Sequence, residues 1–258
     1  MSTILFEKKN GVGYITLHRP EKFNSFNREM ALQFQDTLDV CNADEEVKCI
    51  YLTGHGKAFC AGQDLGEVTG ENPAGFDKIL LEHYNPIIRR LREIPKPIVC
   101  AVNGVAAGAG ANIAIACDIV VANENASFVQ AFSKIGLIPD CGGTYFLPRL
   151  IGFQKATAIM MLADKVTAQE AERLGMIYKY FPTESFVQES INIAEAMAKM
   201  PTQAFALTKQ ALNASLNNSL EEQLQLEDKL QYQAAHTSDY HEGVAAFLEK
   251  RNPEFSGK

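Results

Sequence analysis

Two segments of the chain combine small residues with the expected start of a helix. They are residues 57–65 (KAFCAGQDL) and residues 103–114 (NGVAAGAGANIA). The first turn of a helix has unpaired N–H donors and a partial positive charge, and small side chains let a carbonyl oxygen approach them. Two such termini that face each other would form an oxyanion hole. For either segment alone, tight packing of a helix on a sheet is the simpler explanation.

A third segment, residues 132–152 (FSKIGLIPDCGGTYFLPRLIG), contains Asp140 between Pro139 and a Gly-Gly pair. Asp140 is the sole acidic residue between Asn125 and Leu162. Apolar surroundings disfavour the charged form of a carboxyl group, which raises its basicity and suits proton transfer. Asp140 could equally cap a helix that begins near Gly142. These residues alone leave both interpretations open.

A nucleotide-binding loop is an alternative for residues 108–110, because G-A-G follows an expected strand. The match is poor: Ile113 stands where a third glycine is needed, and Asp118 comes too early to hold a ribose. A phosphate-binding G-x-x-x-x-G-K is also absent from the sequence. The histidines lack the spacing of metal ligands, so no metal is expected. They are His18, His55, His83, His236 and His241.

Composition excludes several classes of protein. A net charge of -7 and a pI near 5.3 argue against a nucleic-acid partner, which would require a dense basic surface. The six cysteines lie far apart, mostly in apolar runs, which predicts reduced thiols in the core. The first residues do not resemble a secretory signal, so we expect a cytoplasmic protein. Residues 97–117 are uncharged, but their Asn and Gly residues favour a packed core over a membrane span.

The pattern of apolar residues predicts the elements that must position these segments. Residues 4–6 and 13–17 form a hairpin around an Asn10-Gly11 turn, and a helix over residues 28–42 follows the cap Asn27. Buried strands at 48–54, 97–104 and 117–123 alternate with helices, which predicts a mostly parallel sheet up to about Phe181. After residue 183 the pattern is helical, at 184–200, 203–216, 220–236 and 240–251. We divide the chain into a core (1–200) and a helical module for oligomerisation (201–258).

Four blocks of the sequence resemble the successive motifs of the crotonase (enoyl-CoA hydratase/isomerase) superfamily. They are HRPEKFNSF, KAFCAGQDL, KPIVCAVNGVAAGAGANIAIACDIVVA and IGLIPDCGGTYFLPRLIG, and the similarity runs nearly end to end. The resemblance implies an α/β crotonase-like (ClpP/crotonase) fold, a spiral of repeated β-β-α units with a C-terminal α-helical trimerisation module. It also implies a homotrimer or homohexamer.

The same resemblance implies roles for individual residues. The family holds a thioester carbonyl with two backbone N–H groups, at positions that are Gln63 and Ala109 here. Because the donors are backbone groups, Ala can replace the usual Gly at the second position. Family hydratases carry two glutamates where this chain has Asn112 and Phe132. Asp140 occupies the position of the acid in some family isomerases, so we expect isomerisation instead of hydration.

Within the superfamily, the blocks resemble those of isomerases that convert a ring 1,2-epoxide of phenylacetyl-CoA to an oxepin and shift double bonds in unsaturated thioesters. Coenzyme A enters as part of the substrate, and no separate cofactor is expected. The resemblance places the coenzyme and substrate along two blocks and the last helix of a neighbouring subunit. The matching residues are Lys22, Phe23, Ala61, Gln63, Asp64, Leu65, Ala109, Asn112, Phe132, Phe247 and Lys250. For either lysine alone, a solvated surface charge is the usual interpretation.

Three other functions remain as alternatives. The first is an aliphatic Δ3-Δ2-enoyl-CoA isomerase or an enoyl-CoA hydratase of fatty-acid oxidation. The second is a non-catalytic acyl-CoA- or RNA-binding homologue, although the acidic pI opposes RNA. The third is a nucleotide-dependent oxidoreductase. The loop at residues 66–75, next to the expected site, raises the further question of whether it orders when substrate binds.

Overall fold

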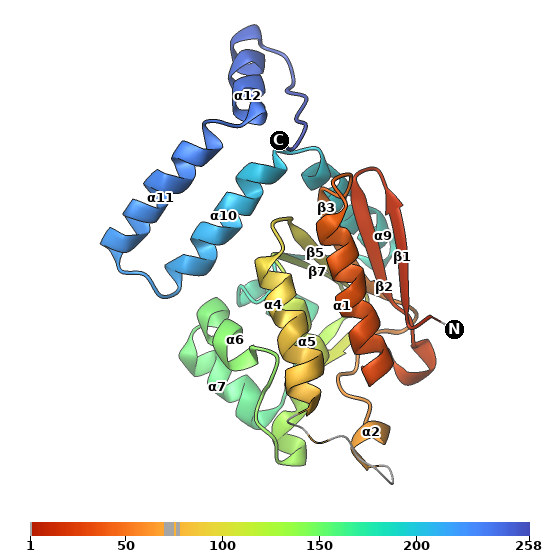
Figure 1. The fold of residues 1–258 in the computed structure, drawn as a ribbon. Coiled ribbons are helices and arrows are strands. Elements are labelled where there is room, and N and C mark those ends of the chain that lie inside the picture. Colours follow the sequence, from red (N-terminus) through yellow and green to blue (C-terminus); the bar gives the residue numbers. More distant parts are fainter. Residues whose placement is uncertain (1, 70–74, 76–77) are drawn as a thin grey trace.

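The computed structural model describes residues 2–69, 75 and 78–258, so residues 70–74 of the loop at 66–75 lie outside the described residues (Figure 1). The described strands form a six-stranded sheet in the order β1-β2-β3-β5-β7-β10 and a four-stranded sheet in the order β4-β6-β8-β9. The elements are β1 (Ile4–Lys9), β2 (Val12–Leu17), η1 (Pro20–Lys22), α1 (Arg28–Ala43), β3 (Cys49–Gly54), β4 (Ala58–Cys60), α2 (Gly66–Thr69), η2 (Ile79–Tyr84), α4 (Asn85–Glu93), β5 (Ile98–Val102), β6 (Val105–Ala107), α5 (Ala109–Ile115), β7 (Ile119–Asn123), β8 (Ser127–Val129), η3 (Ala131–Ile135), α6 (Gly143–Ile151), α7 (Phe153–Leu162), β9 (Lys165–Thr167), α8 (Ala168–Arg173), β10 (Lys179–Phe181), α9 (Thr183–Ala198), α10 (Thr202–Ser215), α11 (Leu220–Ala234) and α12 (Ser238–Glu249).

The large sheet begins with the predicted hairpin. Strands β1 and β2 pair antiparallel with Lys9 opposite Val12, and Asn10 and Gly11 between them both have positive φ (52° and 76°). This is the backbone that an Asn-Gly pair adopts most readily in a two-residue hairpin turn. Strand β2 then pairs parallel with β3, β3 with β5, β5 with β7 and β7 with β10. The expected hairpin and the expected mostly parallel sheet are therefore both confirmed.

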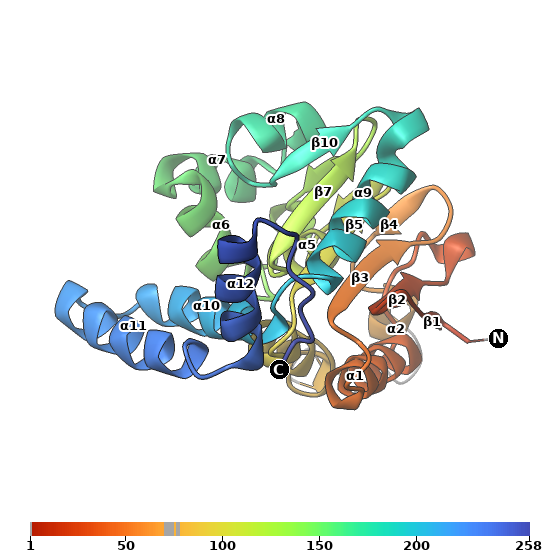
Figure 2. The same ribbon diagram turned by 90° about the horizontal axis from the view of Figure 1, so that it is seen from above.

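Helices cover both faces of the large sheet. Helix α1 starts where Asn27 accepts a hydrogen bond from the Met30 backbone N–H at 2.9 Å, and its face with Phe34 and Leu38 is buried in the main core. Helix α9 packs on the opposite face, where Phe186 joins a second apolar cluster. Figure 2 shows α9 running across β3, β5 and β7. Removal of these apolar side chains from water on both faces stabilises the layered arrangement.

The sequence pattern did not predict β4, β6 and β8 as separate strands. Strand β4 follows β3, β6 follows β5 and β8 follows β7, and in each case the chain leaves the large sheet to join the small one. A helical segment then follows each pair. The chain therefore repeats a strand-strand-helix unit, which is the expected crotonase-like spiral. The first strand of each pair builds the large sheet, and the second carries the chain toward the candidate site.

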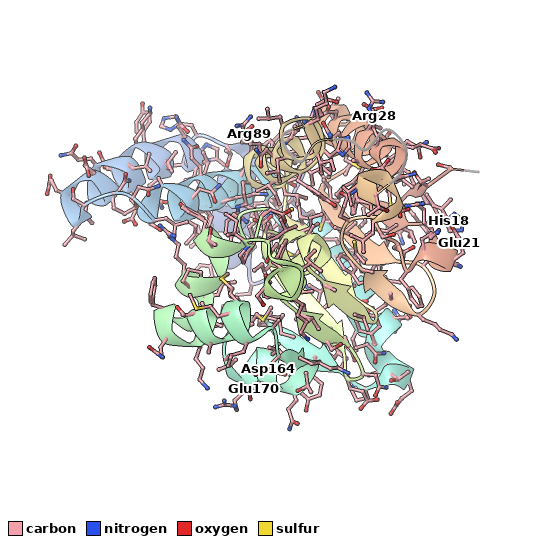
Figure 3. All side chains as sticks on the ribbon, turned by 90° about the horizontal axis from the view of Figure 1, so that it is seen from below. His18, Glu21, Arg28, Arg89, Asp164 and Glu170 are labelled. Carbon is pink, nitrogen blue, oxygen red and sulfur yellow. The ribbon has the colours of Figure 1, made fainter. Side chains whose placement is uncertain are left out.

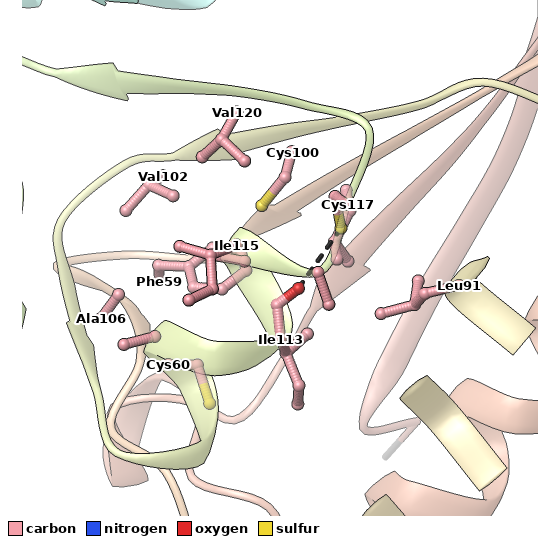
Figure 4. Packing of buried hydrophobic residues seen from close by; sticks show 14 of the residues in the cluster. Phe59, Cys60, Leu91, Cys100, Val102, Ala106, Ile113, Ile115, Cys117 and Val120 are labelled. Carbon is pink, nitrogen blue, oxygen red and sulfur yellow. Dashed lines mark hydrogen bonds between the residues drawn. The ribbon is translucent and has the colours of Figure 1, made fainter. Parts of the chain in front are cut away.

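The uncharged stretch at residues 97–117 forms β5, β6 and α5 instead of one helix. Figure 4 shows α5 inside the core, with Ile115 beside Phe59. None of the helices in the described ranges is long and apolar enough to cross a membrane. All six cysteines are buried and free, which confirms the expected reduced thiols.

The four helices expected after residue 183 are present as α9 to α12. Helix α9 stays on the sheet, whereas α10, α11 and α12 extend away from it (Figure 1). A buried lysine, Lys209 of α10, links this extension to the core. Its ammonium group donates to the Leu91 carbonyl at 2.7 Å and contacts the Asp118 carboxylate at 2.8 Å. The extension is thus anchored by the ion pair of a buried lysine with a partly buried carboxylate.

Candidate active site

The two small-residue segments expected to form an oxyanion hole lie against each other. Gly62 has φ +95°, and a Cβ atom at this position would lie 2.9 Å from the Ala107 carbonyl oxygen and 3.5 Å from the Ala109 nitrogen. A Cβ atom on Gly110 would lie 2.4 Å from the Cys60 carbonyl oxygen. The distances to the two carbonyl oxygens, 2.9 Å and 2.4 Å, are too short for a side chain, so glycine is required at both positions. The chain thereby places Gln63 next to the first turn of α5.

The backbone N–H of Gln63 is oriented by a short β-bridge to Phe26. Phe26 N–H donates to the Gly62 carbonyl at 2.7 Å, and Asp64 N–H donates to the Phe26 carbonyl at 2.8 Å. Because N–H groups alternate in direction along an extended chain, the Gln63 N–H points away from Phe26. It has no acceptor within the described part of the chain. The helix expected after residues 57–65 is present as α2, but it begins only at Gly66. An extended bridge, and not the first turn of a helix, therefore presents the Gln63 donor.

The backbone N–H of Ala109 is presented by a helix start, as expected. Ala109 is the first residue of α5, and Gly108 precedes it with φ 51° and without a capping side chain. The first N–H groups of a helix have no intrahelical acceptor. Among residues 2–69, 75 and 78–258, none accepts from Ala109 N–H. Two free backbone donors therefore lie on adjacent segments, which is the requirement for stabilising an oxyanion.

The carboxyl group of Asp140 lies between η3 and α6. Its Oδ1 atom is buried and has no hydrogen-bond partner among the described residues. Burial raises the pKa of Asp140, although the Cys141 thiol and the Asp140 backbone N–H act in the opposite direction. Its side chain does not cap α6: Gly142 is the N-cap, and Asp140 contributes only its carbonyl oxygen, which accepts from Gly143 N–H at 2.9 Å. The capping alternative is therefore wrong, and the carboxylate is free to accept a proton.

Asn112 connects the two halves of this arrangement. It lies one turn after Ala109 in α5 and is fully buried. Its side-chain N–H donates to the Asp140 carbonyl oxygen at 2.8 Å, and its side-chain oxygen accepts from Gln130 at 2.7 Å. A Cβ atom on Gly143 would overlap the Asn112 amide, so the loop packs directly on it. Asn112 was expected to bind substrate, but its exposed surface is zero and its amide holds the loop that carries Asp140.

Phe132 closes the site from the side of η3. It is buried, and its ring lies 3.7 Å from the position of a Cβ atom on Gly108, directly before the Ala109 donor. An apolar ring thus stands at the position that the resemblance assigned to the second acid of the family hydratases. It lowers the local polarity, which strengthens electrostatic interactions with the two backbone donors.

The residues expected to bind coenzyme A gather beside Gln63. Ala61 N–H donates to the Phe23 carbonyl at 2.9 Å, and Phe23, Lys22 and Leu65 are exposed. Such an edge offers an ammonium group and apolar surface to an incoming ligand.

Asp64 of the same block has a structural role. Burial by itself would raise the pKa of Asp64, but hydrogen bonds from the Arg19 side chain at 2.9 Å and from Gly66 N–H at 3.0 Å outweigh it. The pKa is therefore lowered, and the ionised carboxylate holds the turn that follows Gln63. These partners of Asp64 belong to the protein itself, so its side chain stabilises the conformation of the site.

Phe247 and Lys250 lie elsewhere in this chain. Phe247 belongs to α12 and is 82% exposed, and Lys250 follows directly after that helix. In Figure 1, α12 and α2 lie at opposite ends of the molecule. One chain does not bring these residues to the site, so their role requires a neighbouring subunit and stays a prediction.

The sequence alone did not identify Tyr84 as a residue of the site. It is almost completely buried, and its hydroxyl group donates to the Gln63 side-chain oxygen at 2.8 Å. An aromatic residue beside an expected helix carries no signal of a functional position, because most such residues only fill the core. Only the folded chain brings it to Gln63.

Two free backbone donors and one buried carboxylate define a class of enzyme that stabilises an oxyanion while it moves a proton. The chain belongs to the enoyl-CoA hydratase/isomerase family, whose model matches residues 7–258. It is therefore an enzyme that acts on acyl-CoA thioesters as an isomerase or hydratase.

Particular relatives agree with this class. The chain is 46% identical to a 1,2-epoxyphenylacetyl-CoA isomerase of Escherichia coli (strain K12), with 100% of each chain covered. It is 43% identical to a probable enoyl-CoA hydratase of Rhodobacter capsulatus, over 99% of this chain and 98% of that one. A crystal structure of a putative enoyl-CoA hydratase/isomerase from Mycobacterium abscessus matches with a TM-score of 0.94 and 34% identity, over 99% and 100% of the two chains.

Proposed function

We propose that the chain is an acyl-CoA isomerase in which the backbone N–H groups of Gln63 and Ala109 stabilise an enolate oxygen and Asp140 moves the proton. One observation carries the proposal. Asp140 is a buried carboxylate with a raised pKa, while Asn112 and Phe132 stand at the positions of the hydratase acids. A single proton carrier next to two oxyanion donors suits proton relocation better than activation of water.

The proposed reaction follows from these groups. The thioester oxygen accepts hydrogen bonds from both backbone donors. The Asp140 carboxylate removes a proton from a carbon that is conjugated with the carbonyl, and the electron pair of the broken C–H bond moves toward the oxygen. Asp140 then returns the proton to another carbon, the negative charge leaves the oxygen, and the double bond has shifted. The raised pKa of Asp140 makes the carboxylate a stronger base for the first transfer, and the neutral acid then returns the same proton.

We further propose a ring 1,2-epoxide of phenylacetyl-CoA as substrate, with the oxepin thioester as product. Support comes from the 46% identical relative, which is named a 1,2-epoxyphenylacetyl-CoA isomerase, and from the apolar ring of Phe132 beside the oxyanion donors. The test compares turnover of this epoxide with that of an aliphatic 3-enoyl-CoA. A kcat/KM at least about tenfold higher for the epoxide is expected, which corresponds to about 1.4 kcal/mol of transition-state binding. Higher turnover of the aliphatic thioester would overturn the substrate and leave the isomerase class intact.

Hydration of a 2-enoyl-CoA is the second candidate, because the 43% identical relative carries the name of a probable hydratase. Incorporation of oxygen from isotopically labelled water separates the two reactions. Isomerisation leaves the label in the solvent, whereas a hydratase transfers it to the product.

The active form is proposed to be a homotrimer or homohexamer in the cytoplasm. Large apolar side chains are exposed on α7 and α12, among them Phe153 (80%), Phe247 (82%) and Leu248 (74%), and a neighbouring subunit would cover them. Light scattering coupled to gel filtration measures the mass, and a monomer would contradict the proposal. The six free thiols suit a reducing compartment.

A further inference from the structure

The side chain of Gln63 is held at both ends of its amide group. Its nitrogen donates to the Glu67 carboxylate at 3.1 Å and to the Asp64 carbonyl at 3.3 Å, and its oxygen accepts from the Tyr84 hydroxyl at 2.8 Å. Both partners of the nitrogen are pure acceptors, so the amide can have only this orientation. The amide oxygen therefore faces Tyr84, and Tyr84 must act as the donor.

The surroundings of Tyr84 keep it in the donor form. Burial raises the pKa of Tyr84 well above its ordinary value, and the neighbouring Cys141, Cys60 and Asp140 groups act in the same direction. The phenol consequently retains its proton near neutral pH. Because Asp140 is one of these neighbours, the hydroxyl group lies on the side of the site where Asp140 lies.

An unusual helical turn delivers this hydroxyl group. Tyr84 is the last residue of η2, a π-helical segment, and Asn85 N–H donates to the Leu80 carbonyl, five residues earlier. A π-helical turn contains one extra residue compared with an α-helical turn and shifts the direction of the following side chains. In η2 it turns Tyr84 into the core while Leu81 remains exposed. Such turns are rare and occur frequently at functional sites.

Tyr84 and the backbone that orients Gln63 form one packed unit. The ring of Tyr84 meets the ring of Phe26 edge to face, with centroids 5.9 Å apart, and Phe26 also packs on Phe34 at 6.0 Å. The backbone of Phe26 holds the residues on both sides of Gln63. Gln63 is thus fixed through its backbone by Phe26 and through its side chain by Tyr84, and the two aromatic rings lock against each other.

We propose that Tyr84 is a positioning residue for isomerisation, because its hydrogen bond to the Gln63 side chain keeps the Gln63 backbone N–H aimed at the thioester oxygen. This inference rests on the proposed role of Gln63 as an oxyanion donor. Removal of such a donor costs roughly 100- to 1000-fold in kcat, so a donor that is only less well aimed should cost about tenfold. The loss should fall on kcat and leave KM nearly unchanged, because negative charge develops on the oxygen only as the reaction proceeds.

The test is a double-mutant cycle of Tyr84→Phe and Gln63→Met in the full-length enzyme, with an unsaturated acyl-CoA as substrate. Both single variants remove the hydrogen bond between Tyr84 and Gln63, so each should lower kcat at least about tenfold and change KM by less than about twofold. Gln63→Met also removes the amide contacts with Glu67 and Asp64, so the double variant should lose no more than Gln63→Met alone. Tyr51→Phe is the matched control: Tyr51 is also buried and shares a 2.8 Å hydrogen bond with Ser190, on the opposite face of the sheet. It should lose similar thermal stability and keep its kcat.

Two results would overturn the inference: a kcat of Tyr84→Phe within about twofold of the wild type, or losses that multiply in the double variant. If Tyr84→Phe does not fold, the test depends on Gln63→Met alone. Gln63 is only partly buried, so its replacement should not prevent folding. A full kcat of that variant would then refute the role of the hydrogen bond. The proposed function has its own test in Asp140→Asn. Normal turnover by Asp140→Asn would refute the proposed base. The role of Tyr84 is decided separately, by the coupling between the effects of Tyr84→Phe and Gln63→Met on kcat.

Discussion

Replacing Asp140 with asparagine should lower activity and raise stability at the same time. The substitution conserves shape and removes the charge. A positioned general base contributes roughly 100- to 10,000-fold to a rate, so kcat should fall by at least about 100-fold. Binding of the thioester should stay nearly unchanged, because the backbone donors of Gln63 and Ala109 remain. This combination is expected only if Asp140 carries the proton.

The gain in stability follows from burial of the carboxyl group. Its Oδ1 atom has no hydrogen-bond partner among the described residues, and burial holds the pKa of Asp140 above its ordinary value of 3.8. A buried polar group without a partner costs about 1–3 kcal/mol, and more when it is charged. A neutral amide should recover about 1 kcal/mol of this cost near neutral pH. For a chain of this size, that corresponds to a rise in Tm of roughly 2–4 °C.

The contribution of Asp140 to the stability of the fold depends on pH in a defined direction. Because the pKa is raised in the folded state, the folded protein binds more protons than the unfolded chain between the two pKa values. The Asp140 contribution to stability is therefore complete below the ordinary pKa and is lost as pH rises through the raised pKa. The advantage of Asp140→Asn should consequently be present near neutral pH and disappear in acid. Wild-type kcat should fall as pH decreases through the same raised pKa, since the base becomes protonated.

The assay measures turnover and thermal unfolding of both proteins from acid to neutral pH. Asp164→Asn is the control, because Asp164 is exposed and lies on the surface near Glu170, away from the site (Figure 3). It should change neither quantity. If Asp140→Asn keeps kcat within about tenfold of the wild type, or has a lower Tm near neutral pH, the assignment of a buried catalytic base is refuted.

Three other expectations concern the oxyanion donors, the helical extension and the ligand. Ala109→Pro removes one backbone donor at the first position of a helix, where proline is tolerated, so kcat should fall roughly 100- to 1000-fold, while Ala109→Gly keeps the donor and most of the activity. Lys209→Met leaves the partly buried Asp118 carboxylate without one of its partners and should lower the free energy of unfolding by roughly 3 kcal/mol in urea denaturation. Lys155→Met on the exposed surface should have little effect. A non-reactive acyl-CoA at about 100 times its Kd should stabilise the protein by about 2.7 kcal/mol in thermal unfolding, and NAD(P) should not.

Each of these expectations has a contradicting result. Full activity of Ala109→Pro would show that this N–H does not contact the reacting oxygen. A Lys209→Met variant as stable as the Lys155→Met control would show that the ion pair with Asp118 does not anchor α10. Stabilisation by NAD(P) without stabilisation by acyl-CoA would revive the oxidoreductase alternative, which predicts a bound dinucleotide.

Local interactions made part of the fold predictable. The Asn10-Gly11 pair adopts the positive φ angles of a tight hairpin, and the side chain of Asn27 caps α1 three residues along the chain. Both features depend on neighbours in sequence, so residue types suffice to predict them. The short strands β4 and β6 escaped separate prediction, because three residues are too few to show a hydrophobic period. Their pairing into a second sheet depends on contacts between distant segments.

The candidate site divides in the same way. The sequence by itself determined the two glycine-rich segments, the isolated acid Asp140 and the helix start at Ala109, since each is a property of residues close together in the chain. Only the tertiary structure decided that a bridge to Phe26 aims the Gln63 N–H, that Asn112 is buried beneath the Asp140 loop, and that Tyr84 reaches the Gln63 side chain. Hydrogen-bond direction and desolvation depend on which distant atoms surround a group. They are therefore set when the layers of the fold pack together.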